Sequence, residues 1–454
     1  MTFPFAACLL GLVLAVILLP ALLLGSKVQP LFLIAWALAV VLLMAKGYTW
    51  GGLMDAAALG SQKAFSPILF LLCAGAMIGT WNACGTIPML TLFGISHMSA
   101  GLFLVLAFAG CFVFGIVTGT VFGVCGTVGV MFLAVGRSLN IPDGWGVAAV
   151  AAGAFFGYGL SPLADCTNLV SSTAGVPLSA CIRSQFPVLV PVLAALAAVY
   201  GVCGMQMFSG SGALAADQLA LVEEIEATFR LGFWPAVPPV LVVALLLMKR
   251  PAMLSILAGA GAGALVHFFY QGKSAAETVS AIWVGPDFSA SGETVQSFFG
   301  GGGMSGMSGT VILFLLAFGL FGVLDGCGAV KVVMDRLLTA ATTQRRAAVI
   351  TMLFGFGLNI ICASAMCSFI FTLSCLLPLY ETHGWDKTVL GRSSFVGCLY
   401  MSLFIPWHSN IMTASSLLGV EGNFLLRELA LPAAAVVVLF LLWTFFAGTI
   451  RGEK

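Results

Sequence analysis

Long apolar segments run through almost the whole chain, and they constrain its fold more than any other feature. A helix that crosses a bilayer needs roughly 20 mostly apolar residues, because the hydrocarbon core is about 30 Å thick and each helical residue rises about 1.5 Å. Fourteen segments meet this description: 4–25, 30–46, 66–87, 99–118, 120–138, 146–175, 186–207, 232–248, 251–270, 308–326, 345–363, 364–380, 391–418 and 428–449. The two segments within 99–138, and likewise the two within 345–380, have almost no polar connector between them. Each pair can therefore be two crossing helices or can contain re-entrant or broken pieces.

Charged residues are scarce, and this scarcity decides the environment of the chain. Only 8% of the residues are charged while 61% are apolar, which is too little charge to keep so much hydrocarbon in water. The sequence therefore predicts an all-α polytopic membrane protein with about 12–14 hydrophobic segments and the lipid bilayer as its main partner.

Several functional classes are disfavoured. The formal net charge of +1 provides no field for nucleic acid, and no zinc-finger, P-loop or dinucleotide-binding pattern occurs. The 13 cysteines are scattered without a CxxC pair, which is typical of small buried packing residues. No paired acids, HExxH pattern or nucleophile constellation suggests an enzyme. We expect no nucleic-acid partner and no bound cofactor.

Lysine and arginine positions predict the orientation, because short cytoplasmic loops are enriched in both. If the N-terminus is cytoplasmic and every segment crosses, thirteen of these residues fall inside, and only Lys27, Arg137, Arg230, Lys273 and Arg427 fall outside. No Lys or Arg precedes Lys27, so the first segment lacks the basic region of a cleaved signal peptide and is interpreted as a membrane helix. Both termini are therefore expected in the cytoplasm.

An internal repeat is the most informative pattern. Residues 79–87 match 322–330 at a shift of 243, and residues 161–176 match 405–420 at a shift of 244. We expect a first repeat over 1–207, a polar linker over 208–231 and a second repeat over 232–454. Each repeat holds seven segments, and an odd number of crossings inverts the second copy. Inverted repeats with broken helices or re-entrant pieces at the midplane are typical of secondary transporters, and their ion and substrate sites lie at those breaks.

The first polar stretch inside an apolar segment is 118–129. It contains Thr118, Thr120 and Thr127 among closely spaced glycines, a composition that weakens a helix and frees backbone carbonyls. A small-residue packing face between helices explains the same pattern. Both interpretations stay open, and the three threonines are candidate site residues.

The second stretch, 157–173, holds the strongest candidate. Pro162 breaks the helix, and Asp165, Thr167 and Asn168 follow it closely, with Ser161 just before. A carboxylate inside a membrane is costly and is by default a functional-site candidate. The alternative is a solvated helix cap at the cytoplasmic surface. We favour Asp165 as the residue that binds sodium.

The third stretch, 404–416, is the repeat copy of the second and lacks an acid. Its candidates are His408, Ser409, Asn410 and Thr413. An imidazole can titrate in the physiological range, although a lone histidine is often a hydrogen-bonded structural residue.

Two further polar sets give weaker signals. Asn82 and Asp325 share one repeat position and are interpreted as interfacial helix ends. The sequence does not decide whether they take part in transport. Asn359, Ser364 and Ser368 match the 118–129 stretch only loosely.

Three of these motifs together carry a resemblance to a known family. They are the 118–129 stretch, Ser161-Pro-Leu-Ala-Asp-Cys-Thr-Asn168, and Ile405-Pro-Trp with Leu418-Gly-Val420. Over most of residues 47–420 the chain resembles the NhaC family of sodium/proton antiporters, within the broader ion transporter superfamily. The resemblance implies a bacterial inner-membrane carrier that exchanges sodium for protons, while some relatives exchange dicarboxylates for lactate or move amino acids. It also implies Asp165 as the ion and proton residue, with Thr167 and Asn168 beside it.

The chain departs from the family pattern at three places. The acidic residues usual after a Ser-Arg pair are absent from Gly391-Arg-Ser-Ser-Phe-Val-Gly397, His408 replaces an Asn after Pro-Trp, and Cys166 replaces a Thr. Fewer acids leave room for an organic substrate.

The expected mechanism is competition between sodium and a proton at one buried carboxylate. Burial raises the pKa of a carboxyl group toward neutrality, whereas a sodium ion held by nearby carbonyl and hydroxyl oxygens stabilises the charged form. The helix N-terminus after Pro162 could instead hold an anionic substrate. The alternatives are therefore a sodium- or proton-coupled carrier of a small carboxylate or amino acid and, from another class, a channel. The sequence does not determine the transported solute, the stoichiometry or whether the protein forms a homodimer.

Overall fold

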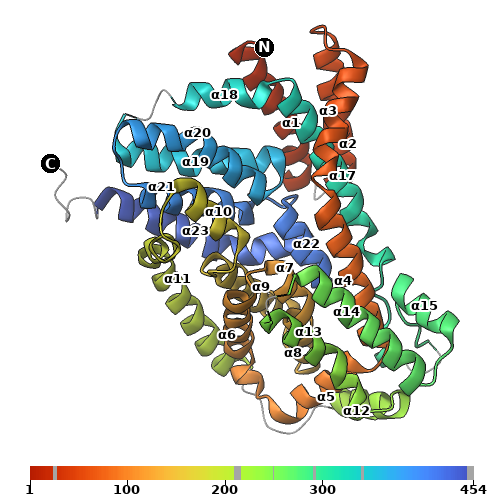
Figure 1. The fold of residues 1–454 in the computed structure, drawn as a ribbon. Coiled ribbons are helices and arrows are strands. Elements are labelled where there is room, and N and C mark those ends of the chain that lie inside the picture. The colour runs from red at the N-terminus through yellow and green to blue at the C-terminus, as the bar shows by residue number, and fades with distance from the viewer. Residues whose placement is uncertain (24–27, 209–215, 249, 290–292, 339–341, 447–454) are drawn as a thin grey trace.

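The computed structural model describes residues 1–23, 28–208, 216–248, 250–289, 293–338 and 342–446, which form helices and no strand (Figure 1). The helices of the first half are α1 (Phe3–Leu23), α2 (Val28–Met44), α3 (Trp50–Gln62), α4 (Phe65–Ala83), α5 (Thr86–His97), α6 (Ala100–Thr118), α7 (Val121–Val124), the π-helix η1 (Cys125–Gly129), α8 (Val130–Ser138), α9 (Asp143–Gly159), α10 (Asp165–Ala174) and α11 (Leu178–Met207).

The second half continues the helical fold. Its elements are α12 (Ala216–Thr228), η2 (Trp234–Ala236), α13 (Val237–Leu247), α14 (Ala252–Leu265), η3 (Val266–Tyr270), α15 (Ala275–Trp283), α16 (Glu293–Phe299), η4 (Ser305–Met307), α17 (Ser308–Gly326), α18 (Ala329–Leu338), α19 (Gln344–Cys362), α20 (Ala365–Thr382), α21 (Lys387–Ser394), η5 (Phe395–Tyr400), η6 (Met401–Phe404), α22 (Ser409–Leu417) and α23 (Gly422–Phe446).

The expectation of an all-α polytopic membrane protein is confirmed. Within the described ranges, nine helices are long and apolar enough to cross a membrane, and a tenth is added if 387–404 and 409–417, bent by 51°, form one span. Three shorter apolar helices lie at 3–17, 28–44 and 234–247. The orientation stays a prediction, and Lys27, Lys249, Arg451 and Lys454, on which it partly rests, lie outside the described residues.

Two predicted segments are not single helices. Segment 146–175 is divided into α9 and α10 by residues 160–164, and segment 391–418 is interrupted at residues 405–408. The pyrrolidine rings of Pro162 and Pro406 remove a backbone donor at these two places. Short helices also occupy regions without a predicted span: α3, α5, α12, α15, α16 and α18. They are too short or too polar to register as membrane segments, and α12 lies inside the predicted linker 208–231.

The helix boundaries recur along the chain as the repeat predicts. Phe65 and Ser308 begin α4 and α17, 243 positions apart. Five later helices in each half begin 244 positions apart: α6 and α19, α7 and α20, α9 and α21, α10 and α22, and α11 and α23. Left-handed backbone also recurs in pairs: Gly85 and Gly328, Gly119 and Ala363, Asn140 and Gly384, and Gly175 and Gly419. The backbone therefore supports an internal duplication, and the inversion of the second copy stays a prediction.

Equivalent glycines make equivalent close contacts in the two copies. A Cβ added at Gly153 of α9 would lie 2.5 Å from the carbonyl oxygen of Phe108, and one at Gly397 of η5 would lie 2.3 Å from that of Met352. Gly153 and Gly397 are 244 positions apart, as are their two carbonyl partners. Such small residues let helix backbones approach closely in membranes. The two copies therefore make this close helix contact in the same way.

Candidate functional site

Each repeat contains two helix breaks that lie against each other. In the first repeat, Gly119 separates α6 from α7, and a Cβ on it would lie 2.8 Å from the backbone nitrogen of Ala164, within the break between α9 and α10. In the second repeat, the N–H of Ser409 at the start of α22 donates to the carbonyl of Ala363 at 2.8 Å, between α19 and α20. Helix ends leave backbone groups without intrahelical partners. Each repeat therefore gathers such groups at one place.

One backbone carbonyl in each repeat anchors the broken segment. The hydroxyl of Ser161 donates to the carbonyl of Ile116 at 2.6 Å, and the indole Nε1 of Trp407 donates to that of Ile360 at 3.1 Å. Ile116 and Ile360 are 244 positions apart. Ser161, a predicted site residue, thus ties the α9–α10 break to α6.

Asp165 is the first residue of α10. Its carboxylate accepts hydrogen bonds from the phenol of Tyr158, in the last turn of α9, and from the N–H of Cys166 at 2.9 Å. No lysine or arginine of the described ranges forms an ion pair with it. Only neutral donors therefore hold this carboxylate, which leaves its charge available to a cation or a proton.

The expected burial of this carboxylate is wrong for the conformation in the structure. Asp165 is exposed, as are Pro162, Leu163 and Asn168 around it. The break at residues 160–164 separates α10 from the largely buried end of α9, so the first turn of α10 lies at an accessible surface. The exposure fits the helix-cap alternative, but the hydrogen bond from Tyr158 reaches across the break and is more than a local cap.

The other first-repeat candidates in this stretch stabilise the break. The amide of Asn168 donates to the carbonyl oxygens of Pro162 at 3.1 Å and Ala164 at 2.9 Å. The carbonyl of Ala164 also accepts the backbone N–H of Asn168 at 3.1 Å, so Asn168 binds this end of the break twice. Thr167 is fully buried, with its hydroxyl 3.9 Å from the thiol of Cys166. Thr167 and Asn168 thus lie next to Asp165 along α10, as predicted, but their side chains make contacts within the segment.

The 118–129 stretch is broken and distorted. Thr118 ends α6 and donates to the carbonyl of Phe114 at 2.8 Å, and Thr120 caps α7 by accepting from the N–H of Gly123 at 3.3 Å. Thr127 lies in the π-helix η1 and donates to the carbonyl of Gly123. The predicted weakening of the helix is confirmed, and a π-helix of this kind is frequent at functional sites.

His408 belongs to a chain of hydrogen bonds in the core of the second repeat. It is fully buried and caps α22: its Nδ1 accepts from the N–H of Asn410 at 3.2 Å. Its Nε2 lies 3.2 Å from the Oδ1 of Asn359, whose amide donates to the carbonyls of Gly397 and Cys398 at 3.0 and 2.8 Å. Since Nδ1 accepts, Nε2 carries the hydrogen and the ring is neutral in this arrangement.

Thr413 differs from the other candidates on α22. Its Oγ1 is buried and has no hydrogen-bond partner among the described residues. α22 packs against α4, α7 and η1 of the first repeat, so this hydroxyl lies in the region where the two copies meet. A buried unsatisfied hydroxyl is costly, and an ion is one partner that would satisfy it.

The two copies differ in accessibility at one repeat position. Asp165 begins α10 and is exposed, whereas Ser409 begins α22 and is only 8% exposed. The broken segment of the first repeat is therefore open, and that of the second repeat is closed by its neighbours.

Sequence reasoning missed three residues around the first break. Tyr158 donates to Asp165, the amide of Gln185 donates to the carbonyl of Gly159 at 3.1 Å, and the phenol of Tyr400 donates to Gln185 at 3.1 Å. Tyr158 and Asp165 lie only seven positions apart on either side of the break, so this pair was open to prediction from the sequence. Gln185 and Tyr400 are 215 positions apart, and no local pattern connects them.

The weaker polar sets prove to be helix-end residues. Asn82 and Asp325 lie in the last turns of α4 and α17, where their carbonyls accept from the N–H groups of Gly85 and Gly328. Ser364 caps α20 as Thr120 caps α7, so the match between these stretches is closer than the sequence indicated.

Comparison with known proteins identifies relatives along almost the full chain. A family model described as the Na+/H+ antiporter family matches residues 206–448. The malate-2H(+)/Na(+)-lactate antiporter of Bacillus subtilis is 29% identical over 98% of this chain and 96% of its own length. The Na(+)/H(+) antiporter NhaC of the same organism is 26% identical over 98% and 95%, and the arginine/ornithine antiporter ArcD of Halobacterium salinarum is 26% identical over 85% and 80%. The chain is thus similar to antiporters with different transported solutes.

Proposed function

Because the chain belongs to the Na+/H+ antiporter family, we propose that this membrane antiporter exchanges sodium ions for protons by competition at Asp165. One negative charge can be neutralised by a sodium ion or by a proton, but not by both at once. Each crossing then carries one of the two cations. The localisation that goes with this proposal is a bacterial inner membrane with both termini in the cytoplasm.

One observation carries the proposal: Asp165 is exposed while its repeat equivalent, Ser409, is closed off. A carrier that works by alternating access exposes its site to one side at a time. The accessible carboxylate is held by neutral donors, the phenol of Tyr158 and the N–H of Cys166. Oxygen atoms are the ligands that a hard cation prefers, so closure of the first break would bring carbonyl and hydroxyl oxygens around the ion.

Coupling in this scheme depends on the two broken segments. α10 of the first repeat packs against α20 of the second, and α22 of the second repeat packs against α7 of the first. Each broken segment thus contacts a broken helix of the other copy. When one contact opens, the other closes, so the carboxylate faces one side of the membrane at a time.

An organic substrate is the second candidate. The carboxylates that the family usually carries are absent from 391–397, and a relative of similar length is named for malate and lactate. The first turn of α10 presents backbone N–H groups, which favour an anion. In this alternative a small carboxylate or an amino acid crosses with sodium or protons.

The test uses everted membrane vesicles with a preset proton gradient and a pH-sensitive dye. Sodium, lithium and potassium are added in turn, followed by malate, lactate and amino acids, and vesicles without the protein provide the baseline. Dissipation of the gradient by sodium supports the exchange proposed here. A response only to an organic solute replaces it with the second candidate, and conductance without coupling would indicate a channel.

A further inference from the structure

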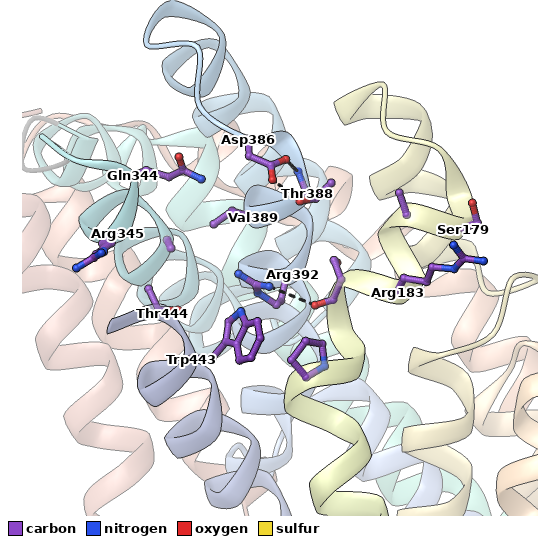
Figure 2. Close-up of a pocket in the computed structure, with 14 residues that line it drawn as sticks. Ser179, Arg183, Gln344, Arg345, Asp386, Thr388, Val389, Arg392, Trp443 and Thr444 are labelled. Carbon is purple, nitrogen blue, oxygen red and sulfur yellow. Dashed lines mark hydrogen bonds between the residues drawn. The ribbon is translucent and has the colours of Figure 1, made fainter. Parts of the chain in front are cut away.

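A cavity of about 690 Å³ lies outside the Asp165 region, among α11, α19, α21 and α23 (Figure 2). Its lining includes three guanidinium groups, from Arg183, Arg345 and Arg392, and one carboxylate, from Asp386. In a chain with only 8% charged residues, such a concentration of positive charge in one cavity is unusual. We call this cavity the arginine pocket.

Arg392 lies in the middle of the arginine pocket, between Arg345 and Arg183 in Figure 2. Its Nε is buried and has no hydrogen-bond partner among the described residues, and its Nη1 donates only to the carbonyl of Ser184, at 3.4 Å. No carboxylate of the described residues forms an ion pair with it. A partly buried guanidinium without a counter-charge is costly, so an anion is the partner that this group lacks.

Asp386 does not supply that partner. Its two carboxylate oxygens accept hydrogen bonds from the N–H and the hydroxyl of Thr388, both at 2.8 Å, where it caps α21. Among the described residues, Arg183 and Arg392 form no ion pair, and the one carboxylate that lines their pocket is already used as a helix cap. The pocket has a positive excess that an external anion can balance.

The surroundings of the pocket are apolar on one side. In Figure 2, Trp443 lies on the opposite side of Arg392 from Asp386. The neighbouring surface exposes apolar side chains: Phe186 (44%) and Val190 (51%) on α11 and Leu442 (47%) on α23. Both helices are long and apolar enough to cross the membrane, and tryptophan is enriched at membrane interfaces. The pocket thus adjoins a surface suited to acyl chains.

We propose that the arginine pocket binds the phosphate group of an anionic phospholipid, with Arg392 as its main ligand. The planar guanidinium matches phosphate geometry and can bind it through two hydrogen bonds. The acyl chains lie along the apolar faces of α11 and α23. The lipid bridges α11 of the first half to α19, α21 and α23 of the second half, independently of which solute the protein exchanges.

Native mass spectrometry of the purified full-length protein tests this assignment. The protein is equilibrated with equal amounts of phosphatidylglycerol and phosphatidylcholine, and the adducts that survive removal of detergent are counted. Phosphatidylglycerol should be retained preferentially. Arg392→Gln should reduce its retention about tenfold, which corresponds to the loss of one charge-assisted interaction. Arg427→Gln, on the exposed opposite end of α23, should leave retention unchanged.

Two further arms distinguish the lipid from a free anion and from a folding defect. Arg183→Gln removes a guanidinium on the rim of the pocket and should lower phosphatidylglycerol retention even if Arg392→Gln fails to give a monodisperse protein. Inorganic phosphate and malate, added at millimolar concentration without lipid, should not bind measurably. The proposal is overturned if Arg392→Gln or Arg183→Gln retains as much phosphatidylglycerol as the control Arg427→Gln. Tight binding of free phosphate or malate overturns it as well.

Discussion

The phenolic hydroxyl of Tyr158 donates a hydrogen bond to the carboxylate of Asp165, across the break that separates α9 from α10. The bond links the buried end of α9 to the exposed first turn of α10. The equivalent positions in the second repeat, Ser402 and Ser409, carry no acid, and Ser402 donates to the carbonyl of Leu399 instead. At this pair of repeat positions, therefore, only the first copy carries a carboxylate.

Replacement of Asp165 by asparagine should abolish sodium-dependent proton flux and leave the fold intact. The side-chain oxygen of asparagine can still accept from Tyr158 and Cys166, but it has no charge for sodium or a proton to neutralise. Dye assays in everted vesicles measure the flux. Asp143→Asn, which breaks an exposed ion pair with Arg137, is the control and should retain it. Persistent sodium-driven flux in Asp165→Asn would exclude this residue from the exchange.

Replacement of Tyr158 by phenylalanine should weaken sodium binding. The variant keeps the ring but loses the donor that orients the carboxylate, and a hydrogen bond to a charged group contributes about 1.5–3 kcal/mol. We expect the sodium concentration at half-maximal flux to rise about tenfold or more. Tyr48→Phe, which loses a hydrogen bond to the carbonyl of Cys327 far along the chain, should not change it. If the sodium concentration at half-maximal flux is unchanged in Tyr158→Phe as it is in Tyr48→Phe, Tyr158 does not orient the carboxylate for sodium binding.

Replacement of Thr413 by valine separates stability from ion binding. Its buried hydroxyl has no hydrogen-bond partner in the described chain, so removal should leave stability unchanged or raise it by about 1 kcal/mol. If the hydroxyl is an ion ligand, the sodium affinity falls in the same variant. Thermal unfolding and flux measurements provide the two readouts. Thr351→Val, which loses a hydrogen bond to the carbonyl of Ala347 at 2.7 Å, should instead lower stability.

Two substitutions of His408 test its structural role. Asparagine can cap α22 and donate to Asn359, so His408→Asn should keep both stability and transport. His408→Leu leaves the N–H of Asn410 and the Oδ1 of Asn359 without partners, each at a cost of about 1–3 kcal/mol. Melting temperatures and flux should therefore fall only in the leucine variant. Loss of transport in a well-folded His408→Asn protein would show that the imidazole itself takes part.

Replacement of Gly397 by alanine should destabilise the core. The new Cβ would lie 2.3 Å from the carbonyl oxygen of Met352, so α19 and η5 must separate, and overpacking of this kind costs about 1–3 kcal/mol. Gly357→Ala, on α19 with no atom within 4 Å of its Cβ, should leave the melting temperature unchanged or slightly higher. Equal melting temperatures in the two variants would contradict the close contact between α19 and η5.

Much of the fold could be predicted from the sequence because membrane helices are encoded locally. Segment 99–118 is apolar over the thickness of a bilayer, and α6 begins and ends within one residue of it. The repeat was detectable because both breaks retain a proline, Pro162 and Pro406, and because the stretches 171–176 and 415–420 that follow them both read Ser-Ser-x-x-Gly-Val. Helices such as α3 and α18 were missed, since neither has the length nor the uniform apolar character of a membrane span.

The candidate site was predictable only as a set of residues. Pro162 and the polar residues after it indicate a broken helix with a carboxylate, and the resemblance to known carriers names Asp165. Whether that carboxylate is buried depends on how α10 packs, and the prediction of burial was wrong for this conformation. The hydrogen bond between the Nε2 of His408 and the Oδ1 of Asn359 likewise joins residues 49 positions apart.

The sequence by itself determined the membrane environment, the helical class and the identity of the polar residues at the breaks, and it predicted the duplication, because hydrophobic length and helix-breaking residues act locally. Only the tertiary structure decided that Tyr158 holds Asp165, that the first break is open and the second closed, and that Arg392 lacks a counter-charge in its pocket. These features join residues as far apart as Arg392 and Ser184, 208 positions along the chain. Packing of distant helices brings such groups together, so the local sequence around each residue does not predict its partner.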